Sequence, residues 1–227
     1  MPSAVATPSD SKSLKSGKPR WPDWSGETVA CIATGPSLTA EQIVRVKDSG
    51  IKAIAINEAG LDRFVPLAAP WADILYAADR RWWRYYIDEV PDGIMRVSGE
   101  VIKEKRLNDT VIPAIDTIAL KMLDMDKGPM PKEPGSVVSG GHSGFQALGL
   151  ALSLGAKRIL LLGYDCGGPK RNCHEDRPEV FCVHNQPQQW VQHYNRVPKE
   201  WPDVEVINCS PISKIACFKK RPIEEVL

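Results

Sequence analysis

The chain has 227 residues, of which 43% are hydrophobic and 25% are charged, and its formal net charge is +1 at pH 7. This length suits one full-sized domain, and the composition is that of a globular protein rather than a disordered one. The charge balance argues against a dedicated DNA-binding protein and gives no field that would attract a membrane surface. We therefore expect small-molecule or nucleotide-linked substrates as partners, and the sequence is compatible with a homo-oligomer.

The sequence contains no apolar stretch of about 18 residues, the minimum for a membrane-spanning helix. Its N-terminal segment lacks the apolar core of a secretion signal, so we expect a cytoplasmic protein. Disulfides are not expected, because three of the six cysteines lie in apolar strand-like contexts where a reduced cysteine acts as a small hydrophobe. These three are Cys31, Cys209 and Cys217.

The chain begins with residues 1–20, which are rich in Ser, Lys, Pro and Ala and show no periodicity. This composition predicts a disordered N-terminal arm. Residues 21–227 are expected to form the folded domain. Its first unit is an apolar run at residues 28–33, a tight loop, and a helical pattern in which Thr39 and Gln42 have the spacing of a capping box.

Strand-like runs then alternate with helical patterns. Gly50 is a stop signal for the first helix. Further strands are predicted at residues 51–56, 73–78 and 94–97, and an aromatic helical segment follows the second of these. Residues 100–135 show no clear pattern, and we expect a peripheral excursion there.

The clearest unit lies in the C-terminal half. Residues 143–154 predict a helix, and residues 157–163 a strongly buried strand. A last helix at about 187–201 and a last strand at 204–208 follow. Strands that alternate with helices predict a mainly parallel sheet covered by helices on both faces. We therefore expect the α/β class and a single Rossmann-like domain.

In open α/β sheets, ligands bind at the carboxyl ends of the strands, near the point where the strand order reverses. The candidate nucleotide-binding residues are therefore those that follow predicted strands. A first set comprises Gly35, Pro36, Ser37, Asn57, Asp79 and Asp165. Glycine permits close backbone approach in the loop 35–37, and the next helix offers free N–H groups. A turn with a serine cap is the alternative for this loop.

A second glycine-rich loop opens the helix at 143–154. It comprises Ser139, Gly140, Gly141, His142 and Ser143. Such a loop can hold an anion with backbone N–H groups, so we expect it to contact the nucleotide. The loop lacks the lysine of a Walker motif, which disfavours P-loop kinase chemistry. A flexible linker is the alternative interpretation.

Acidic and imidazole side chains supply the candidate chemistry. Asp79 and Asp165 could bind Mg²⁺ or hydroxyl groups, and Asp165 could equally cap the following turn. Among the four histidines we expect His184, with His174 in reserve, to transfer protons, because both lie in a long polar loop beyond a strand. His193 falls within the predicted last helix and is expected to have a surface or packing role.

The same loop holds several cysteines and histidines, the residue types that bind zinc. Their spacings fit no common zinc motif, and no metal site is predicted. The residues concerned are Cys166, Cys173, His174, Cys182 and His184.

Several motifs resemble those of known families. These motifs are Gly35-Pro36-Ser37-Leu38 after a first strand, Asn57 after a second, Ser139-Gly140 before a helix, and the segments 159–165 and 206–213. They resemble the bacterial sialyltransferases of glycosyltransferase family 42. They also resemble the MptE-like domain, which is named after 6-hydroxymethylpterin diphosphokinases and also occurs in phage and prophage proteins. The similarity extends over about residues 28–218.

The resemblance implies that the loop 35–37 and Asn57 line a nucleotide, with Ser139 and Gly140 near its phosphate or sugar. It also implies that His184 is the general base, because sialyltransferases carry a histidine before the last helix. The tyrosines that those enzymes place near the donor phosphate have no clear match, since Tyr164 precedes Asp165 rather than following it. This departure argues against sialyl transfer itself.

Our leading hypothesis is a group transferase of glycosyltransferase type that uses a nucleotide-activated donor, a CMP- or UDP-sugar, with His184 deprotonating the acceptor. A second hypothesis is a diphosphokinase that transfers diphosphate from ATP to a small alcohol. It would need Mg²⁺, with Asp79 or Asp165 as ligands. A third is a non-catalytic phage accessory protein that binds a nucleotide.

Overall fold

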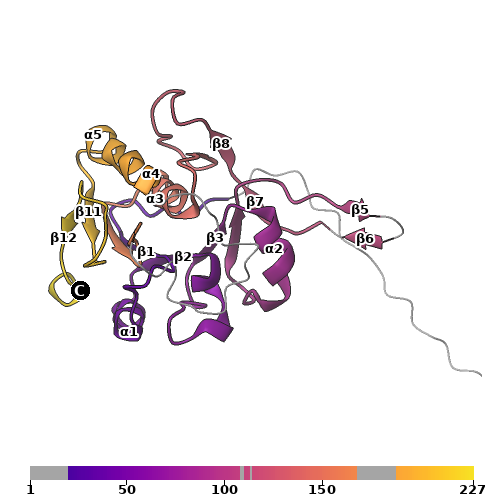
Figure 1. Ribbon diagram of the computed structural model, residues 1–227, viewed down its shortest axis with the longest axis horizontal. Coiled ribbons are helices and arrows are strands. Elements are labelled where there is room, and N and C mark those ends of the chain that lie inside the picture. Colours follow the sequence, from indigo (N-terminus) through magenta and orange to yellow (C-terminus); the bar gives the residue numbers. More distant parts are fainter. Residues whose placement is uncertain (1–19, 108–109, 113, 168–187) are drawn as a thin grey trace, which may run out of the picture.

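The computed structural model describes residues 20–107, 110–112, 114–167 and 188–227 (Figure 1). Residues 1–19 of the predicted arm lie outside the described part of the chain. So do His174 and His184, the two histidines expected to transfer protons, and the cysteines Cys173 and Cys182.

An eight-stranded sheet forms the middle layer. Its strands are β1 (Thr28–Ile32), β2 (Lys52–Ile56), β3 (Ile74–Ala77), β4 (Met95–Ser98), β7 (Ile118–Ala119), β10 (Arg158–Leu162), β11 (Glu205–Asn208) and β12 (Lys219–Lys220). They lie in the order β12-β11-β10-β1-β2-β3-β4-β7, and each neighbouring pair runs parallel. The predicted α/β class with a mainly parallel sheet is confirmed.

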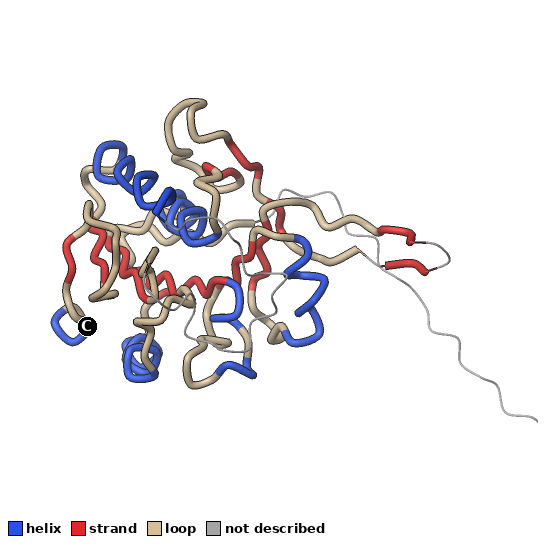
Figure 2. Tube along the Cα trace, in the orientation of Figure 1, coloured by secondary structure: helices blue, strands red, loops and turns tan. Residues whose placement is uncertain are grey.

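Helices cover both faces of this sheet (Figure 2). The α-helices are α1 (Ala40–Ser49), α2 (Arg80–Tyr86), α3 (Ser143–Ser153), α4 (Gln188–Val191) and α5 (Val197–Glu200). The 3-10 segments are η1 (Asn57–Gly60), η2 (Asp62–Phe64), η3 (Ile87–Glu89), η5 (Gln192–Arg196) and η6 (Ile223–Glu225). Within the described residues, no helix is both long enough and apolar enough to cross a bilayer.

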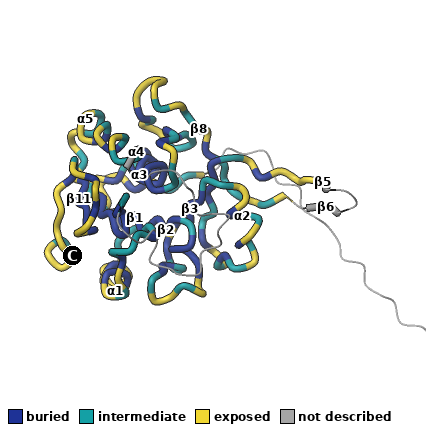
Figure 3. The backbone as a smooth tube through the Cα atoms, viewed as in Figure 1, coloured by how far each residue is buried: buried dark blue, intermediate teal, exposed yellow. Residues whose placement is uncertain are grey.

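The strands of the main sheet are largely buried (Figure 3), and their alternate residues enter two separate hydrophobic cores. Cys31 and Ile54 pack with α3 on one face, whereas Ile32 packs with α1 and α2 on the other. Since both faces are covered, β3 is fully buried and β1, β2 and β10 are buried beyond their first residue, so they read as continuous apolar runs. Burial of these runs positions the loops at their ends.

The first helix follows its predicted signals closely. The Thr39 hydroxyl accepts a hydrogen bond from the Gln42 N–H at 3.3 Å, and the Gln42 side chain accepts one from the Thr39 N–H at 3.2 Å. Gly50 ends the helix in the left-handed region at φ 66°. The capping box and the glycine stop are confirmed.

Residues 100–135, which were expected to form a peripheral excursion, contain several short strands. β5 (Lys105–Leu107) and β6 (Thr110–Ile112) form a hairpin that projects from one end of the molecule (Figure 1). β8 (Lys121–Leu123) pairs with β9 (Ser136–Val138), and β7 adds an edge strand to the main sheet. Part of the expected excursion therefore belongs to the sheet.

The expected last helix, at about 187–201, is not one regular helix. In its described part, α4, η5 and α5 follow one another, with the 3-10 segment in the middle. Pro198 has no N–H and cannot continue the hydrogen bonding of the preceding turns, so α5 begins anew around it. The two-residue strand β12 was also not predicted, because Lys219 and Lys220 carry no apolar pattern.

Candidate functional site

The strand order reverses between β1 and β10. From β1 the sheet grows through β2, β3 and β4 in one direction, whereas β10, β11 and β12 extend it in the other. The loops that follow β1 and β10 therefore leave the same edge side by side and turn apart. This is the point at which open α/β sheets bind ligands.

Two glycines bring these loops into backbone contact. The Gly35 N–H donates to the Gly163 carbonyl at 2.9 Å. A side-chain carbon at Gly35 would overlap both that carbonyl and the Asp165 carboxylate. Gly163 has a φ of 67°, which favours glycine. The sequence identified Gly35 as a site of close backbone approach, but the partner in that approach is Gly163.

Asp165 fixes the loop after β1. Its side chain is buried with the residue only 2% exposed, and its Oδ2 accepts a hydrogen bond from the Ser37 N–H at 2.8 Å. The sequence left open whether Asp165 caps the following turn. It instead binds a loop that lies 128 positions earlier in the chain.

Two polar atoms at this contact have no hydrogen-bond partner in the described chain. They are the Ser37 hydroxyl oxygen and the second carboxylate oxygen of Asp165, Oδ1, and both are buried. Buried polar atoms nearly always have a hydrogen-bond partner. Two such atoms without partners at a switch point therefore mark a place where ligand atoms can complete the hydrogen bonding.

Backbone strain occurs at the same edge. Asn57, directly after β2, has a φ of 54°, and Cys166, two residues after Tyr164, has a φ of 49°. Asparagine tolerates this left-handed region better than most residues, whereas cysteine does not. Strained backbone of this kind collects at binding sites, where the surrounding structure holds it in place.

Asp79 lies at the same edge, but its carboxylate is engaged. It caps α2 by accepting a hydrogen bond from the Arg81 N–H at 2.8 Å. The Arg81 guanidinium also donates to both of its oxygens, at 2.6–3.1 Å. The structure thus gives Asp79 a local structural role at a position where we predicted contact with a nucleotide.

The loop 139–143 reaches this edge from another direction. Ser143 begins α3, and its hydroxyl lies 3.4 Å from the Ala78 N–H that follows β3. Gly140 and Gly141 have φ values of 54° and 77°, and their N–H groups make no hydrogen bond with the described chain. Ser37 and Ser143 therefore stand at one edge of the sheet.

Aromatic residues hold this loop in place. The His193 Nδ1 lies 2.7 Å from the Gly140 carbonyl, as expected for a packing role. A side-chain carbon at Gly140 would overlap the Phe145 ring, and one at Gly141 would lie 3.2 Å from Trp190 Nε1. These contacts make the loop part of the packed body rather than a linker.

His142 precedes α3 within this loop, and its ring stacks on Trp190 with 4.7 Å between centroids. Its Nε2 is buried and has no hydrogen-bond partner in the described chain. Burial lowers the pKa of the His142 imidazole from 6.5 to about 3, and repulsion from His193 acts in the same direction. The ring is therefore neutral near pH 7 and can offer a hydrogen bond but no charge.

The segment 208–213, called the clamp segment below, ties the loop after β10 to the neighbouring strand. The Tyr164 N–H donates to the Ser210 hydroxyl at 2.8 Å, and the Ser213 hydroxyl donates to the Tyr164 carbonyl at 2.6 Å. The Asn208 side chain donates to Ser213 in turn, at 2.8 Å. The sequence singled out this segment after a strand, but its clamping role depends on contacts that no local pattern reveals.

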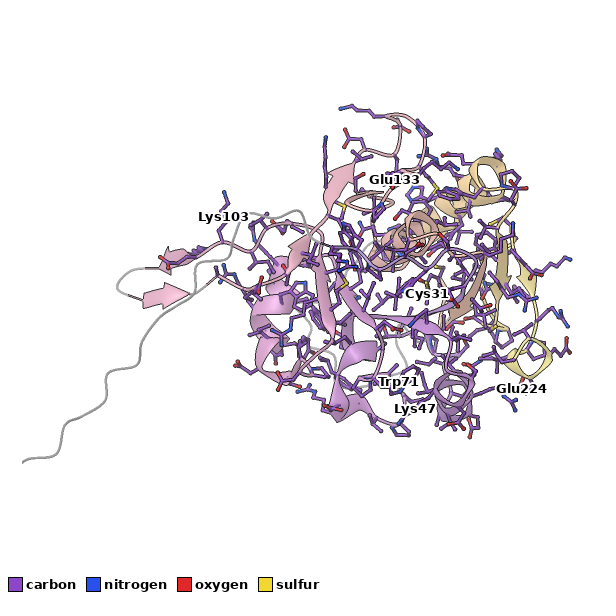
Figure 4. The ribbon with its side chains drawn as sticks, turned by 180° about the vertical axis from the view of Figure 1, so that it is seen from behind. Cys31, Lys47, Trp71, Lys103, Glu133 and Glu224 are labelled. Atoms are coloured by element: carbon purple, nitrogen blue, oxygen red, sulfur yellow. The ribbon has the colours of Figure 1, made fainter. Side chains whose placement is uncertain are left out.

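A hollow of about 690 Å³ lies at the opposite edge, by the amino ends of β2, β3 and β4. It is lined in part by Trp71 (Figure 4), Lys52 and Asp73. Asp73 is already satisfied, because it pairs with Lys52 at 3.3 Å and accepts a hydrogen bond from the Ala53 N–H at 2.9 Å. We place the candidate site at the carboxyl edge, where polar atoms are left unpaired.

No cluster of three or more His, Cys, Asp or Glu side chains suited to a metal ion occurs among the residues that the structure describes. All four cysteines that the structure describes are free thiols, and one of them, Cys31, lies in the core (Figure 4).

No protein-family model matches this chain, and no curated protein is significantly similar to it. Solved structures share its fold. The MAf glycosyltransferase from Magnetospirillum magneticum AMB-1 superposes with a TM-score of 0.56 at 14% identity, over 87% of this chain and 34% of that one. This chain therefore spans about a third of the Magnetospirillum protein.

The sialyltransferase CstII from Campylobacter jejuni, solved in complex with a substrate analogue, cytidine-5'-monophosphate, is also similar. Its TM-score is 0.51 at 11% identity, over 86% of this chain and 85% of that one. The chain thus has the Rossmann-like fold of these glycosyltransferases, as the resemblance to sialyltransferases implied.

We expect Asp165→Ala to lower the free energy of unfolding by about 1–3 kcal/mol, because the Ser37 N–H loses its acceptor. Asp165→Asn keeps an oxygen acceptor and should lower it less. Urea denaturation followed by circular dichroism measures both. Asp124→Ala, which removes an exposed ion pair with Lys127, is the control and should change stability by less than about 1 kcal/mol. Equal losses in all three variants would contradict the assigned role.

The depressed pKa of His142 predicts a pH dependence of stability. The unfolded chain binds a proton on this residue near pH 6.5, whereas the folded chain does so only near pH 3. Its contribution to stability is therefore present above pH 6.5 and is lost progressively as the pH falls towards 3. The wild type should lose more stability than His142→Asn between about pH 7 and about pH 5 in urea denaturation. Parallel losses would show that His142 titrates normally.

Proposed function

We propose that this chain is a group transferase of glycosyltransferase type that takes a nucleotide-linked donor. The observation that carries the proposal is the pair of unpaired buried atoms, Ser37 Oγ and Asp165 Oδ1, at the switch point between β1 and β10. Nucleotides bind at switch points in this class of sheet. The chain shares its fold with the two glycosyltransferases, one of which was solved with CMP.

Each loop of the carboxyl edge would contact a different part of the donor. The loop 35–37 lies against the nucleotide, with its close backbone approach secured by Gly35. Asn57 contacts the base or ribose, since its amide makes no hydrogen bond with the described chain. The N–H groups of Gly140 and Gly141, which have no acceptor in the described chain, suit a phosphate or sugar oxygen. CMP- and UDP-sugars are the donors to test first.

Transfer requires a base. The acceptor hydroxyl attacks the donor carbon, the bond from that carbon to the phosphate oxygen breaks, the nucleotide leaves, and the hydroxyl proton passes to the base. His142 is too weak a base, with a pKa of about 3. We assign the base to His184, with His174 in reserve, because both lie in the polar loop beyond a strand.

The rival diphosphokinase would need Mg²⁺ ligands from Asp79 or Asp165. Asp79 is held by Arg81, and one oxygen of Asp165 is committed to the Ser37 N–H. These commitments favour the metal-independent transferase. The third candidate, a non-catalytic phage accessory protein that binds a nucleotide, is distinguished only by the absence of turnover.

Calorimetry with CMP, UDP and ATP, each with and without Mg²⁺, tests the donor class. We expect CMP or UDP to bind without metal. Gly35→Ala should weaken this binding at least about tenfold, because the added carbon displaces Gly163 or Asp165. Gly149→Ala is the matched control, since its added carbon would have no neighbour nearer than 3.7 Å. Binding of ATP alone, and only with Mg²⁺, would instead identify the diphosphokinase.

Release of CMP or UDP from the corresponding sugar donors, in the presence of saccharide acceptors, measures turnover. His184→Ala should lower turnover at least about a hundredfold and leave calorimetric donor binding unchanged, because a general base acts on the acceptor. Unchanged turnover would remove His184 from the mechanism. Binding without any turnover in the wild type would identify the non-catalytic relative.

A further inference from the structure

Lys214 follows the clamp segment 208–213 directly and is fixed beside the switch point. Its backbone N–H donates to the Asp165 carbonyl at 2.8 Å. The same Asp165 holds the Ser37 N–H through its side chain. The Lys214 backbone is therefore bonded to Asp165, the residue that joins the loops after β1 and β10.

The stem of the Lys214 side chain runs along Gly167. A side-chain carbon at Gly167 would lie 2.8 Å from Lys214 Cγ, 3.6 Å from its Cε and 3.8 Å from its Cδ. Any side chain at residue 167 would thus push the lysine away from the loop that follows β10. Gly167 keeps the lysine at this edge of the sheet, and the contact directs a long surface side chain that would otherwise have many conformations.

The charge at Lys214 has no partner in the described chain, and the residue is exposed. Three other cations that the structure describes at this edge are engaged. Arg81 pairs with Asp79 at 2.6 Å, Arg80 pairs with Glu100 at 3.1 Å, and Lys220 donates to the Ser213 carbonyl at 2.6 Å. The Lys214 backbone is bonded to Asp165, whose Oδ1 is unpaired in the described chain, so a lysine charge on this segment suits a ligand that carries both hydroxyl groups and an anion.

We propose that Lys214, held by Gly167, binds the phosphate of the donor nucleotide. The inference rests on the proposed function and deepens it by assigning the anion of the donor. A lysine ammonium is a compact point charge that suits phosphate oxygens. Because the leaving phosphate gains negative charge as the bond to the sugar breaks, a cation in contact with it lowers the barrier as well as the dissociation constant.

Calorimetry of the full chain with three kinds of probe tests this role: CMP and UDP, the nucleosides cytidine and uridine, and inorganic pyrophosphate. The variants are Lys214→Gln, which removes the charge, and Gly167→Ala, which keeps the charge but displaces the lysine. Lys157→Gln is the matched control, because Lys157 is an exposed lysine at the amino end of β10, on the opposite edge. Circular dichroism establishes that each variant is folded.

We expect Lys214→Gln and Gly167→Ala to weaken binding of the nucleotide and of pyrophosphate by roughly tenfold to a hundredfold, as loss of a charged hydrogen bond does. Nucleoside binding should be unchanged, and Lys157→Gln should behave as the wild type. Undiminished nucleotide binding in Lys214→Gln would overturn this inference and leave the proposed function intact. Pyrophosphate binding that needs Lys214, without binding of any nucleotide, would support the anion site and overturn the proposed function. A wild type that binds none of the probes would overturn both.

Discussion

One carboxylate joins the two strands at which the sheet changes direction. Asp165, at the end of β10, accepts the Ser37 N–H and so fixes the loop after β1, while Gly35 and Gly163 allow the two backbones to touch. A hydrogen bond between a buried carboxylate and a backbone N–H is among the stronger contacts in a protein. The remaining features of the site, from the strained Cys166 to the clamp at 208–213, are arranged around this contact.

The parallel topology explains why candidates from distant parts of the sequence converge. All the strands of the main sheet end at one edge, so each residue that follows a strand reaches that edge whatever its place in the chain. The amino edge has the aromatic hollow near Trp71, but Lys52 and Asp73 in its lining pair with each other. A polar ligand gains more where Ser37 and Asp165 leave atoms unpaired.

The sequence was sufficient to predict features that depend on local pattern. Buried strands appear as apolar runs, and the capping box that begins at Thr39 depends only on residues 39–42. Contacts between distant residues were out of reach: nothing near Asp165 indicates that its partner is the Ser37 N–H, and nothing near Lys214 indicates that Gly167 directs it. The helix-capping role of Asp79 could not be told from the sequence for a related reason, since the same residue type serves both as a ligand contact and as a helix cap.

Nitrogen–proton correlation spectra of the labelled protein, titrated with CMP and UDP, test the location of the site most directly. If the switch point is the nucleotide site, the amide signals that move will be those of Gly35, Ser37, Asn57 and Asp165. Movement confined to Lys52, Trp71 and Asp73 would place the ligand in the hollow at the opposite edge. That result would contradict the account given for the carboxyl edge.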